Sequence, residues 1–264
     1  MSRWAPPLLV GLVLLAGAAV ALGAKNGEGD LIVSLEGGID PVKLPRTELA
    51  PVSIEVSGDV ESASQNSESL PQLRRIMVAI NSGGRLFDRG LPVCTPKRIQ
   101  PAREDEARKI CGDALVGSGH VDVQVRFRSQ PPFLVRAKAL AFNGPRAGGS
   151  KWILVQIYAA DPPGTILLPF EVIKKKGVYG TVLVAKLPQS AYDWAYLLHF
   201  DLSLHREYVF RGVRRSYVSA SCAAPQGFYR AFFPLARATY SFDTGQHLSV
   251  TQPSTCRVAP GSAR

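Results

Sequence analysis

Apolar and polar side chains alternate along the middle of the chain, and this pattern predicts consecutive β-strands between Phe133 and Leu187. The segment reads FLVRAKALAF, KWILVQIY, TILLPFEVI and YGTVLVAKL in succession. Successive side chains of a strand point to opposite faces. One face of the first strand would therefore carry Phe133, Val135, Ala137, Ala139 and Ala141, and the other Arg136 and Lys138. We expect Asn143-Gly144 and Lys176-Gly177 to be the glycine turns between antiparallel neighbours.

The same period of two recurs on both sides of this segment. Before it, the pattern predicts strands at residues 30–35, 52–58, 76–80 and 117–128, with Gly37 and Gly38 ending the first of them. Residues 76–87 read as a hairpin, residues 25–28 as a loose N-terminus and residues 59–69 as an exposed loop. After it, strands are expected at residues 197–210, 216–221, 228–233, 236–242 and 247–251, with a reversal at residues 243–246.

Helical signals are confined to one short stretch near residues 101–111. Proline stands at its start, acidic residues fill the first turns, basic residues fill the last ones, and Gly112 follows. Residues 188–194 would add one helical turn. The fold class predicted is all-β, an antiparallel β-sandwich with a barrel as the alternative. We expect one domain over residues 25–260, or two packed subdomains at 25–113 and 114–260.

The first 24 residues have the features of a secretory signal peptide. Arg3 precedes a short apolar run at residues 8–20, and cleavage sites follow Ala21 and Ala24. An uncleaved anchor is the alternative, although a spanning helix needs about 20 apolar residues. No later segment is long and apolar enough to span a bilayer. The chain is therefore predicted to be secreted or associated with the cell envelope.

Four cysteines lie in the exported part, and an even number in an oxidising compartment predicts two disulfides. Three pairings are possible, and we favour Cys94–Cys111 with Cys222–Cys256 because each pair closes one local excursion of the chain. Each loop would restrict the unfolded chain by roughly 3–4 kcal/mol. A metal site at these cysteines is a weaker interpretation, since the chain has no C-x-x-C motif.

The net charge is the strongest indication of a partner. The chain has 31 basic and 21 acidic residues, and the resulting charge of +10 at pH 7 would attract anionic molecules or surfaces. Basic residues cluster at two expected hairpin tips, as Lys174, Lys175 and Lys176 and as Arg211, Arg214 and Arg215. Further basic residues that would extend this surface are Arg74, Arg75, Arg126, Arg128, Arg136 and Lys138. Such a surface would bind an anionic envelope polymer or a membrane surface. The alternative is that these charges only maintain solubility. No nucleic-acid module is recognisable.

A second candidate lies in the stretch HFDLSLHRE at residues 199–207. On one regular strand, His199, Asp201, Ser203, His205 and Glu207 would share a face, with Phe200, Leu202 and Leu204 opposite. A metal held by His199, Asp201 and His205 is the chemistry this row suggests, and Ser203 adds the residue types of a hydrolytic triad. The alternative is a solvated sheet face. No G-x-S-x-G elbow supports the triad.

Five short segments stand out together: KNGEGDLIVS, LPQLRRI, GLPVC, AFNGP and RRSYVSASC. They resemble a group of bacterial exported proteins that has no assigned activity. The resemblance implies export with paired cysteines and carries over no site residue.

Together these patterns predict an exported structural or binding protein without a cofactor, rather than an enzyme. Its partner would be an anionic envelope component. The alternative is a secreted metal-dependent enzyme that uses the His/Asp strand face. The oligomeric state stays open.

Overall fold

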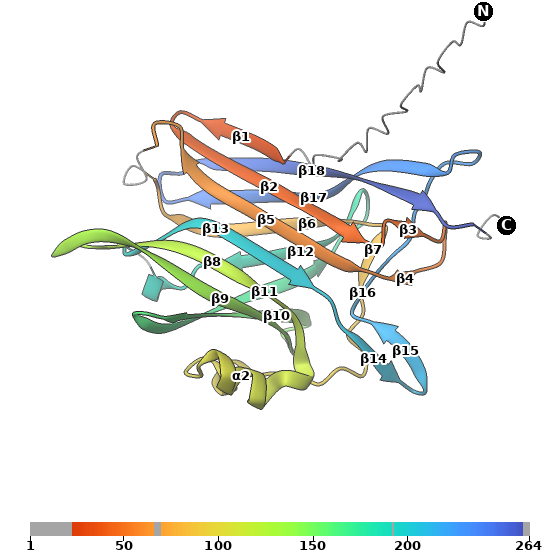
Figure 1. Ribbon diagram of the computed structural model, residues 1–264, viewed down its shortest axis with the longest axis horizontal. Helices are drawn as coiled ribbons and strands as arrows, with labels where there is room; N and C mark the ends of the chain where they lie inside the picture. Colours follow the sequence, from red (N-terminus) through yellow and green to blue (C-terminus); the bar gives the residue numbers. More distant parts are fainter. Residues whose placement is uncertain (1–22, 66–69, 192, 261–264) are drawn as a thin grey trace, which may run out of the picture.

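One large sheet that curls over on itself forms the body of the protein (Figure 1). The structure is a computed structural model that describes residues 23–65, 70–191 and 193–260. In these residues, 13 strands follow one another in the order β1-β2-β5-β13-β8-β9-β10-β11-β12-β6-β17-β18-β3. The pairings are antiparallel except between β18 and β3. β18 also contacts β1 and β2, so curling brings the two ends of the sheet together as facing layers.

The elements have the following bounds. The first part of the chain contains β1 (Ala24–Glu28), β2 (Leu31–Asp40), β3 (Lys43–Leu44), β4 (Ala50–Pro51), β5 (Ser53–Ser62), β6 (Leu73–Asn81) and β7 (Gly84–Leu86). Two helices, α1 (Pro96–Ile99) and α2 (Glu104–Cys111), and the 3-10 turn η2 (Gly112–Ala114) precede β8 (Leu115–Phe127). Next come β9 (Gln130–Ala147), β10 (Ser150–Ala160), β11 (Pro163–Lys174), β12 (Tyr179–Lys186), η3 (Gln189–Ala191) and β13 (Ala195–Leu204). The last strands are β14 (Glu207–Phe210), β15 (Val213–Ser216), β16 (Val218–Ala220), β17 (Arg230–Phe242) and β18 (His247–Val258).

The predicted fold class, all-β with one short helix near residues 101–111, is confirmed. Period-two patterning identified most of the long strands because one face of the curled sheet is buried. Val135, Ala137 and Ala139 of β9 are buried, whereas Arg136 and Lys138 are exposed. The facing layers belong to one continuous sheet, in which strands from both halves of the chain alternate.

Several predicted ends and turns were wrong, and each error has a tertiary cause. Gly37 and Gly38 do not end a strand, since they pair with β5 inside β2. Asn143-Gly144 is not a turn either, because both residues lie within β9 and the chain reverses at Gly148-Gly149, whose φ angles are 59° and 81°. The second predicted glycine turn is confirmed between β11 and β12.

Other strands were joined or divided wrongly. Residues 76–87 are not a hairpin, because β7 leaves β6 and pairs with β16. Residues 25–28 are paired with β2 as β1 rather than loose. Residues 59–62 extend β5, so the predicted loop begins later, and residues 66–69 lie outside the described residues. One strand, β17, replaces the two predicted at residues 228–242, and the strand predicted at residues 197–210 ends at Leu204.

Polar contacts join the facing layers. The buried Tyr240 hydroxyl of β17 donates to the carbonyl oxygen of Ser34 in β2 at 3.0 Å. At the sheet's edge, the Ala24 amide donates to Oε1 of Gln252 in β18 at 3.3 Å. These bonds satisfy polar groups that would otherwise be buried without partners.

A second small core lies on the outer face of β9 and β10, beneath the two helices. Leu140, Phe142 and Leu154 contribute to it from the strands. The buried amide of Gln156 donates to the carbonyl oxygens of Ile99 and Ala102 at 2.8 and 2.7 Å, which holds the helical segment against β10.

Both predicted disulfides, Cys94–Cys111 and Cys222–Cys256, are present. The first closes a loop of sequence separation 17 within the small core, and the second links the segment after β16 to β18. The predicted signal peptide lies almost wholly outside the described residues, which begin at Gly23. Among the described residues, no helix has the length and apolar character needed to cross a membrane.

Candidate functional site

Four of the six predicted basic residues lie around one pocket of about 570 Å³. Lys174 is the last residue of β11 and Lys175 follows it, whereas Arg214 and Arg215 come from β15. A fifth cation, Arg85 of β7, joins them. We call the site formed by these five residues the basic pocket. Of the strands that border it, β7, β15 and β16 lie together on the right-hand side of Figure 1.

Main-chain and tyrosine contacts hold the β14–β15 hairpin beside β7. The amide of Phe87 donates to the carbonyl oxygen of Tyr217 at 2.8 Å. The hydroxyl of Tyr208 donates to the carbonyl oxygens of Phe87 and Arg89 at 3.2 and 3.0 Å. The Arg215 guanidinium lies 5.5 Å from the centre of the Phe87 ring. The hairpin is therefore anchored so that Arg214 and Arg215 line the same pocket as Arg85 of β7.

Positive charge in the basic pocket is poorly neutralised. No acidic residue lines it, and within the described residues only Arg214 of the five forms an ion pair, with Glu207 at 3.1 Å. The Lys174 ammonium donates to the Thr181 hydroxyl at 3.0 Å. Burial first, and then the charge of Arg85, lower the pKa of Lys174, although Asp88 partly offsets them. A bound anion would relieve this repulsion.

The other predicted basic residues lie elsewhere. Lys176 is exposed at the β11–β12 reversal and Arg211 lies beside the Phe210 ring, and neither lines the basic pocket. Four of the six residues expected to extend the surface have their own partners. Arg74 pairs with Asp243 at 3.7 Å, Arg136 with Asp122 at 3.1 Å and Lys138 with Glu104 at 2.9 Å, while Arg126 stacks on Tyr196.

A buried lysine lies next to the basic pocket. Lys151 has a side chain only 8% exposed, and its ammonium lies 3.6 Å from Asp88 and 4.6 Å from the centre of the Tyr217 ring. Asp88 also pairs with Arg146 at 2.8 Å. Burial lowers the pKa of Lys151 to about 8, with Asp88 opposing the shift and Arg146 and Lys174 adding to it.

Replacing Lys151 with methionine should therefore stabilise the protein at pH 7, by roughly 3 kcal/mol. Between pH about 8 and 10.5 the native lysine has lost its proton, while the unfolded lysine still holds one. Unfolding takes up a proton in this window, so wild-type stability rises with pH relative to the variant. Urea unfolding of both proteins at pH 7 and pH 10 should show the difference shrinking. A difference that stays constant with pH would refute the assignment to Lys151.

The predicted His/Asp row is only partly formed. β13 ends at Leu204, so His205 and Glu207 do not continue the face that carries His199 and Asp201. The prediction for the opposite face is confirmed, because Phe200, Leu202 and Leu204 point into the interior. The described residues show no hydrogen bond between Ser203 and His205, and no group of three or more His, Cys, Asp or Glu side chains placed to hold a metal ion.

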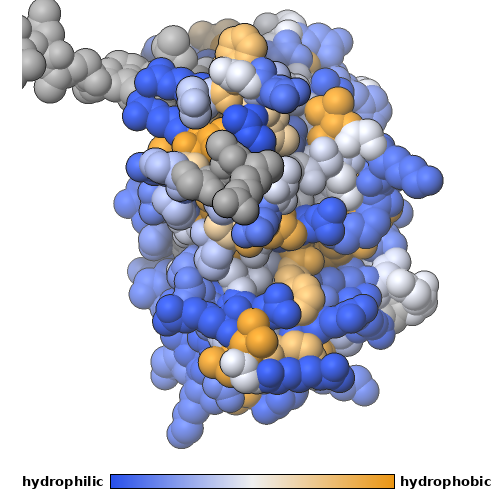
Figure 2. All heavy atoms as spheres, turned by 90° about the vertical axis from the view of Figure 1, so that its right-hand side faces the viewer, coloured by the Kyte–Doolittle hydropathy of each residue, from blue (hydrophilic) through white to orange (hydrophobic). Residues whose placement is uncertain are grey.

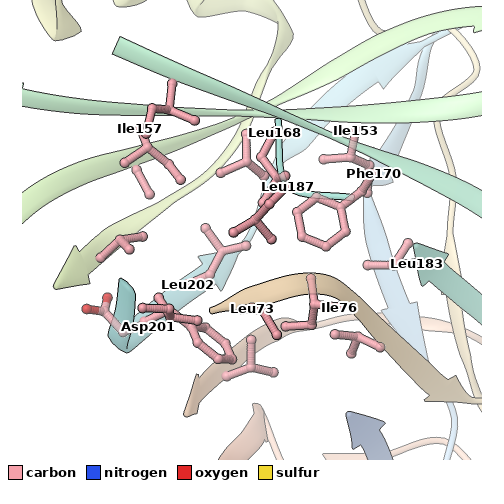
Figure 3. A pocket seen from close by; sticks show the side chains of 18 of the residues that line it. Leu73, Ile76, Ile153, Ile157, Leu168, Phe170, Leu183, Leu187, Asp201 and Leu202 are labelled. Carbon is pink, nitrogen blue, oxygen red and sulfur yellow. The ribbon is translucent and has the colours of Figure 1, made fainter. Parts of the chain in front are cut away.

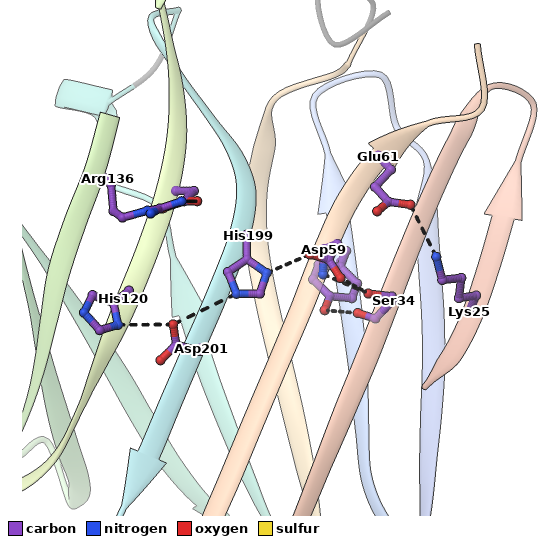
Figure 4. A network of polar contacts seen from close by, with 10 residues as sticks. Lys25, Ser34, Asp59, Glu61, His120, Arg136, His199 and Asp201 are labelled. Atoms are coloured by element: carbon purple, nitrogen blue, oxygen red, sulfur yellow. Dashed lines mark hydrogen bonds and ion pairs between the residues drawn. The ribbon is translucent and has the colours of Figure 1, made fainter. Parts of the chain in front are cut away.

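What the structure shows instead is a chain of polar contacts across four strands (Figure 4). Nδ1 of His199 lies 2.7 Å from Oδ1 of Asp59. The other carboxylate oxygen of Asp59 accepts a hydrogen bond from the Ser34 hydroxyl, at a distance of 2.6 Å. Asp201 lies 3.4 Å from Nδ1 of His120 and 4.0 Å from Nε2 of His199. Sequence reasoning missed Asp59, which was assigned to a loop, and left His120 without a partner.

An apolar cavity of about 180 Å³ lies between the facing layers (Figure 3). Aliphatic side chains such as Ile157, Leu168 and Leu187 converge on it, together with Phe170. The one charged residue in its lining is Asp201, whose carboxylate contacts His120.

An open groove of about 570 Å³, which we call the aromatic groove, lies between this cavity and the basic pocket. Phe228 and Phe232 line it and are 64% and 76% exposed. Figure 2 shows the side of the molecule on the right of Figure 1, where hydrophobic patches interrupt a mostly hydrophilic surface. Sequence reasoning missed both hollows, because the pattern of a strand shows which residues face inward but not whether they fill the space.

Comparison of the chain with protein-family models, curated proteins and solved structures found no match. The likeness to exported bacterial proteins therefore stays a prediction.

Proposed function

We propose that this protein is an exported binding protein that holds an anionic component of the cell envelope at the basic pocket. One observation carries the proposal: five cations converge on a pocket that has no acidic residue in its lining. Four of them belong to β7, β11 and β15, and Lys175 directly follows β11. Only one of the five has an ion-pair partner among the described residues. Clustered, unpaired positive charge attracts anions and strengthens their binding at low salt.

The two disulfides support the compartment. Disulfides persist in oxidising surroundings and are rare in the cytosol. Both cysteine pairs are formed, which suits an extracellular or envelope location. Export through a signal peptide at residues 1–24 remains part of the proposal.

Binding is favoured over catalysis because the best-formed cluster of side chains is a set of cations suited to holding an anion. The alternative is a metal-dependent enzyme at the His/Asp face. Of its three predicted metal ligands, only His199 and Asp201 lie next to each other in the structure. His205 lies beyond the end of β13.

A test compares wild type with two variants that carry the same net charge. The pocket variant replaces Arg85, Lys174, Lys175, Arg214 and Arg215 with Gln. The control variant replaces the exposed lysines Lys25, Lys43, Lys97, Lys109 and Lys186 with Gln. We expect the pocket variant to bind isolated envelope at least about tenfold more weakly than the control at low salt, since charge-assisted contacts are each worth more than 1 kcal/mol.

Cosedimentation across a salt titration provides the measurement. Wild-type and control binding should fade as salt rises, because ions screen the attraction. Equal binding by the pocket and control variants would overturn the proposal, since general charge would then explain the affinity.

A further inference from the structure

The apolar cavity, the aromatic groove and the basic pocket adjoin one another in series, because each shares lining residues with the next. Ile54, Ile80 and Leu235 line both the cavity and the groove. Ser82 and Gly84 line both the groove and the basic pocket. A ligand that occupied all three would be apolar at one end and anionic at the other.

The cavity has the character of a site for a hydrocarbon. Its lining side chains are aliphatic or aromatic, apart from Asp201, which faces His120 instead. A cavity of about 150 Å³ lined by Leu, Ile and Phe stays dry and binds small apolar molecules, and this one is about 180 Å³. Empty apolar space lowers stability. An occupant that fills it would recover that loss.

Small side chains keep this space open. Ala139 of β9 and Ala195 of β13 are buried and line the cavity, where larger residues would fill it. The curled sheet therefore has a hollow interior beneath the aromatic groove.

The groove supplies an apolar path to the surface. Phe228 and Phe232 are among the most exposed large hydrophobic side chains of the described residues, and both border the groove. Neighbouring Tyr229 is 72% exposed. Exposed aromatic clusters of this kind mark binding surfaces, and they suit the boundary between lipid and water.

We infer that the ligand is an anionic lipid, with its acyl chain in the aromatic groove and the apolar cavity and its headgroup at the basic pocket. This inference rests on the proposed function and names the chemistry of its ligand. Charge complementarity selects the headgroup, because a neutral or cationic lipid would leave the pocket's cations unpaired. The shared lining of the cavity and the groove favours a ligand with an acyl chain, because a headgroup alone would leave both apolar hollows empty.

The test uses dodecanoate and dodecanol, which share one chain and differ in the headgroup. Each competes with the neutral dye N-phenyl-1-naphthylamine, whose fluorescence rises in apolar surroundings. Wild type should bind dodecanoate at least about tenfold more tightly than dodecanol, as expected for one charge-assisted contact in a partly buried site. The pocket variant should lose this preference and keep dodecanol binding, whereas the control variant should behave as wild type.

Two further variants test the proposed binding site of the acyl chain. Ala139→Phe fills the cavity and should weaken both ligands about tenfold or more, because the chain loses its buried contacts. Since overpacking can disturb folding, the double variant Phe228→Ser with Phe232→Ser alters only exposed positions and should also weaken both ligands. Phe127→Ser, an exposed phenylalanine that does not line the groove, is its control.

The outcomes separate the inference from the proposed function. No binding of either ligand to wild type overturns the lipid inference, even if envelope binding still depends on the basic pocket. Equal affinity for dodecanoate and dodecanol overturns the headgroup assignment. A preference for dodecanoate that survives in the pocket variant also overturns the headgroup assignment, because the carboxylate would then lie elsewhere, whereas the proposed function is overturned only if envelope binding is equal in the pocket and control variants.

Discussion

Replacing Gly119 with alanine is expected to lower the free energy of unfolding by about 4 kcal/mol or more, a loss that only severe steric or core changes produce. Gly119 lies within β8, and a Cβ atom there would overlap the carbonyl oxygen of Asp201 and lie 2.8 Å from its carbonyl carbon. Both obstacles are backbone atoms of β13, so no side-chain rotation can relieve them. Urea unfolding followed by circular dichroism measures the effect.

Gly38→Ala is the matched control. Gly38 also lies in a strand of the main sheet, but a Cβ atom there meets nothing within 4 Å. Alanine at this position should be neutral or stabilise by up to about 1 kcal/mol, because it restricts the unfolded chain. Similar urea midpoints for the two variants would show that β8 and β13 do not approach each other as closely as described.

Removing the Cys222–Cys256 disulfide is expected to cost about 4 kcal/mol of stability, from the entropy that its loop returns to the unfolded chain. The bond has a sequence separation of 34, and both cysteines are buried in the main core. The double substitution Cys222→Ala with Cys256→Ala should lower the urea midpoint accordingly. Cys94→Ala with Cys111→Ala, a separation of 17, should cost about 3 kcal/mol.

Reduction provides an independent check. Treating wild type with a thiol reductant under unfolding conditions should reproduce the combined losses, because the same loops are opened. If reduced wild type unfolds at the same urea concentration as oxidised protein, the disulfides do not contribute the stability assigned to them. Cys256 also lines the aromatic groove, so loss of its bond should weaken lipid binding as well as stability.

β13 contributes both to the close strand packing at Gly119 and to the lining of the apolar cavity. Its inner face lines the apolar cavity through Phe200, Leu202 and Leu204, while Asp201 and His199 take part in the polar contacts on the other face. Strand patterning alone anticipated this division between faces. The cavity depends on it, since polar side chains turned inward would admit water and weaken an apolar ligand's binding.

The sequence by itself determined the strand class, the short helix, the disulfide pairs and the inward faces. These depend on local pattern, because period two, capping residues and cysteine spacing act over a few to a few tens of residues. The correct prediction for Phe200, Leu202 and Leu204 needed no knowledge of their neighbours. Lys174 and Arg215 stood out in the same way, as basic residues next to expected turns.

Only the tertiary structure decided which of these residues meet. Arg85 joined the basic pocket because β7 leaves β6 and pairs with β16, an exchange of partners that no local pattern records. Gly37 and Gly144 were misread as signs of a strand end or turn, since glycine serves equally where neighbouring strands approach closely. The apolar cavity between the layers exists because the side chains contributed by many strands do not together fill the space between those layers. Such long-range packing decided where a ligand could bind.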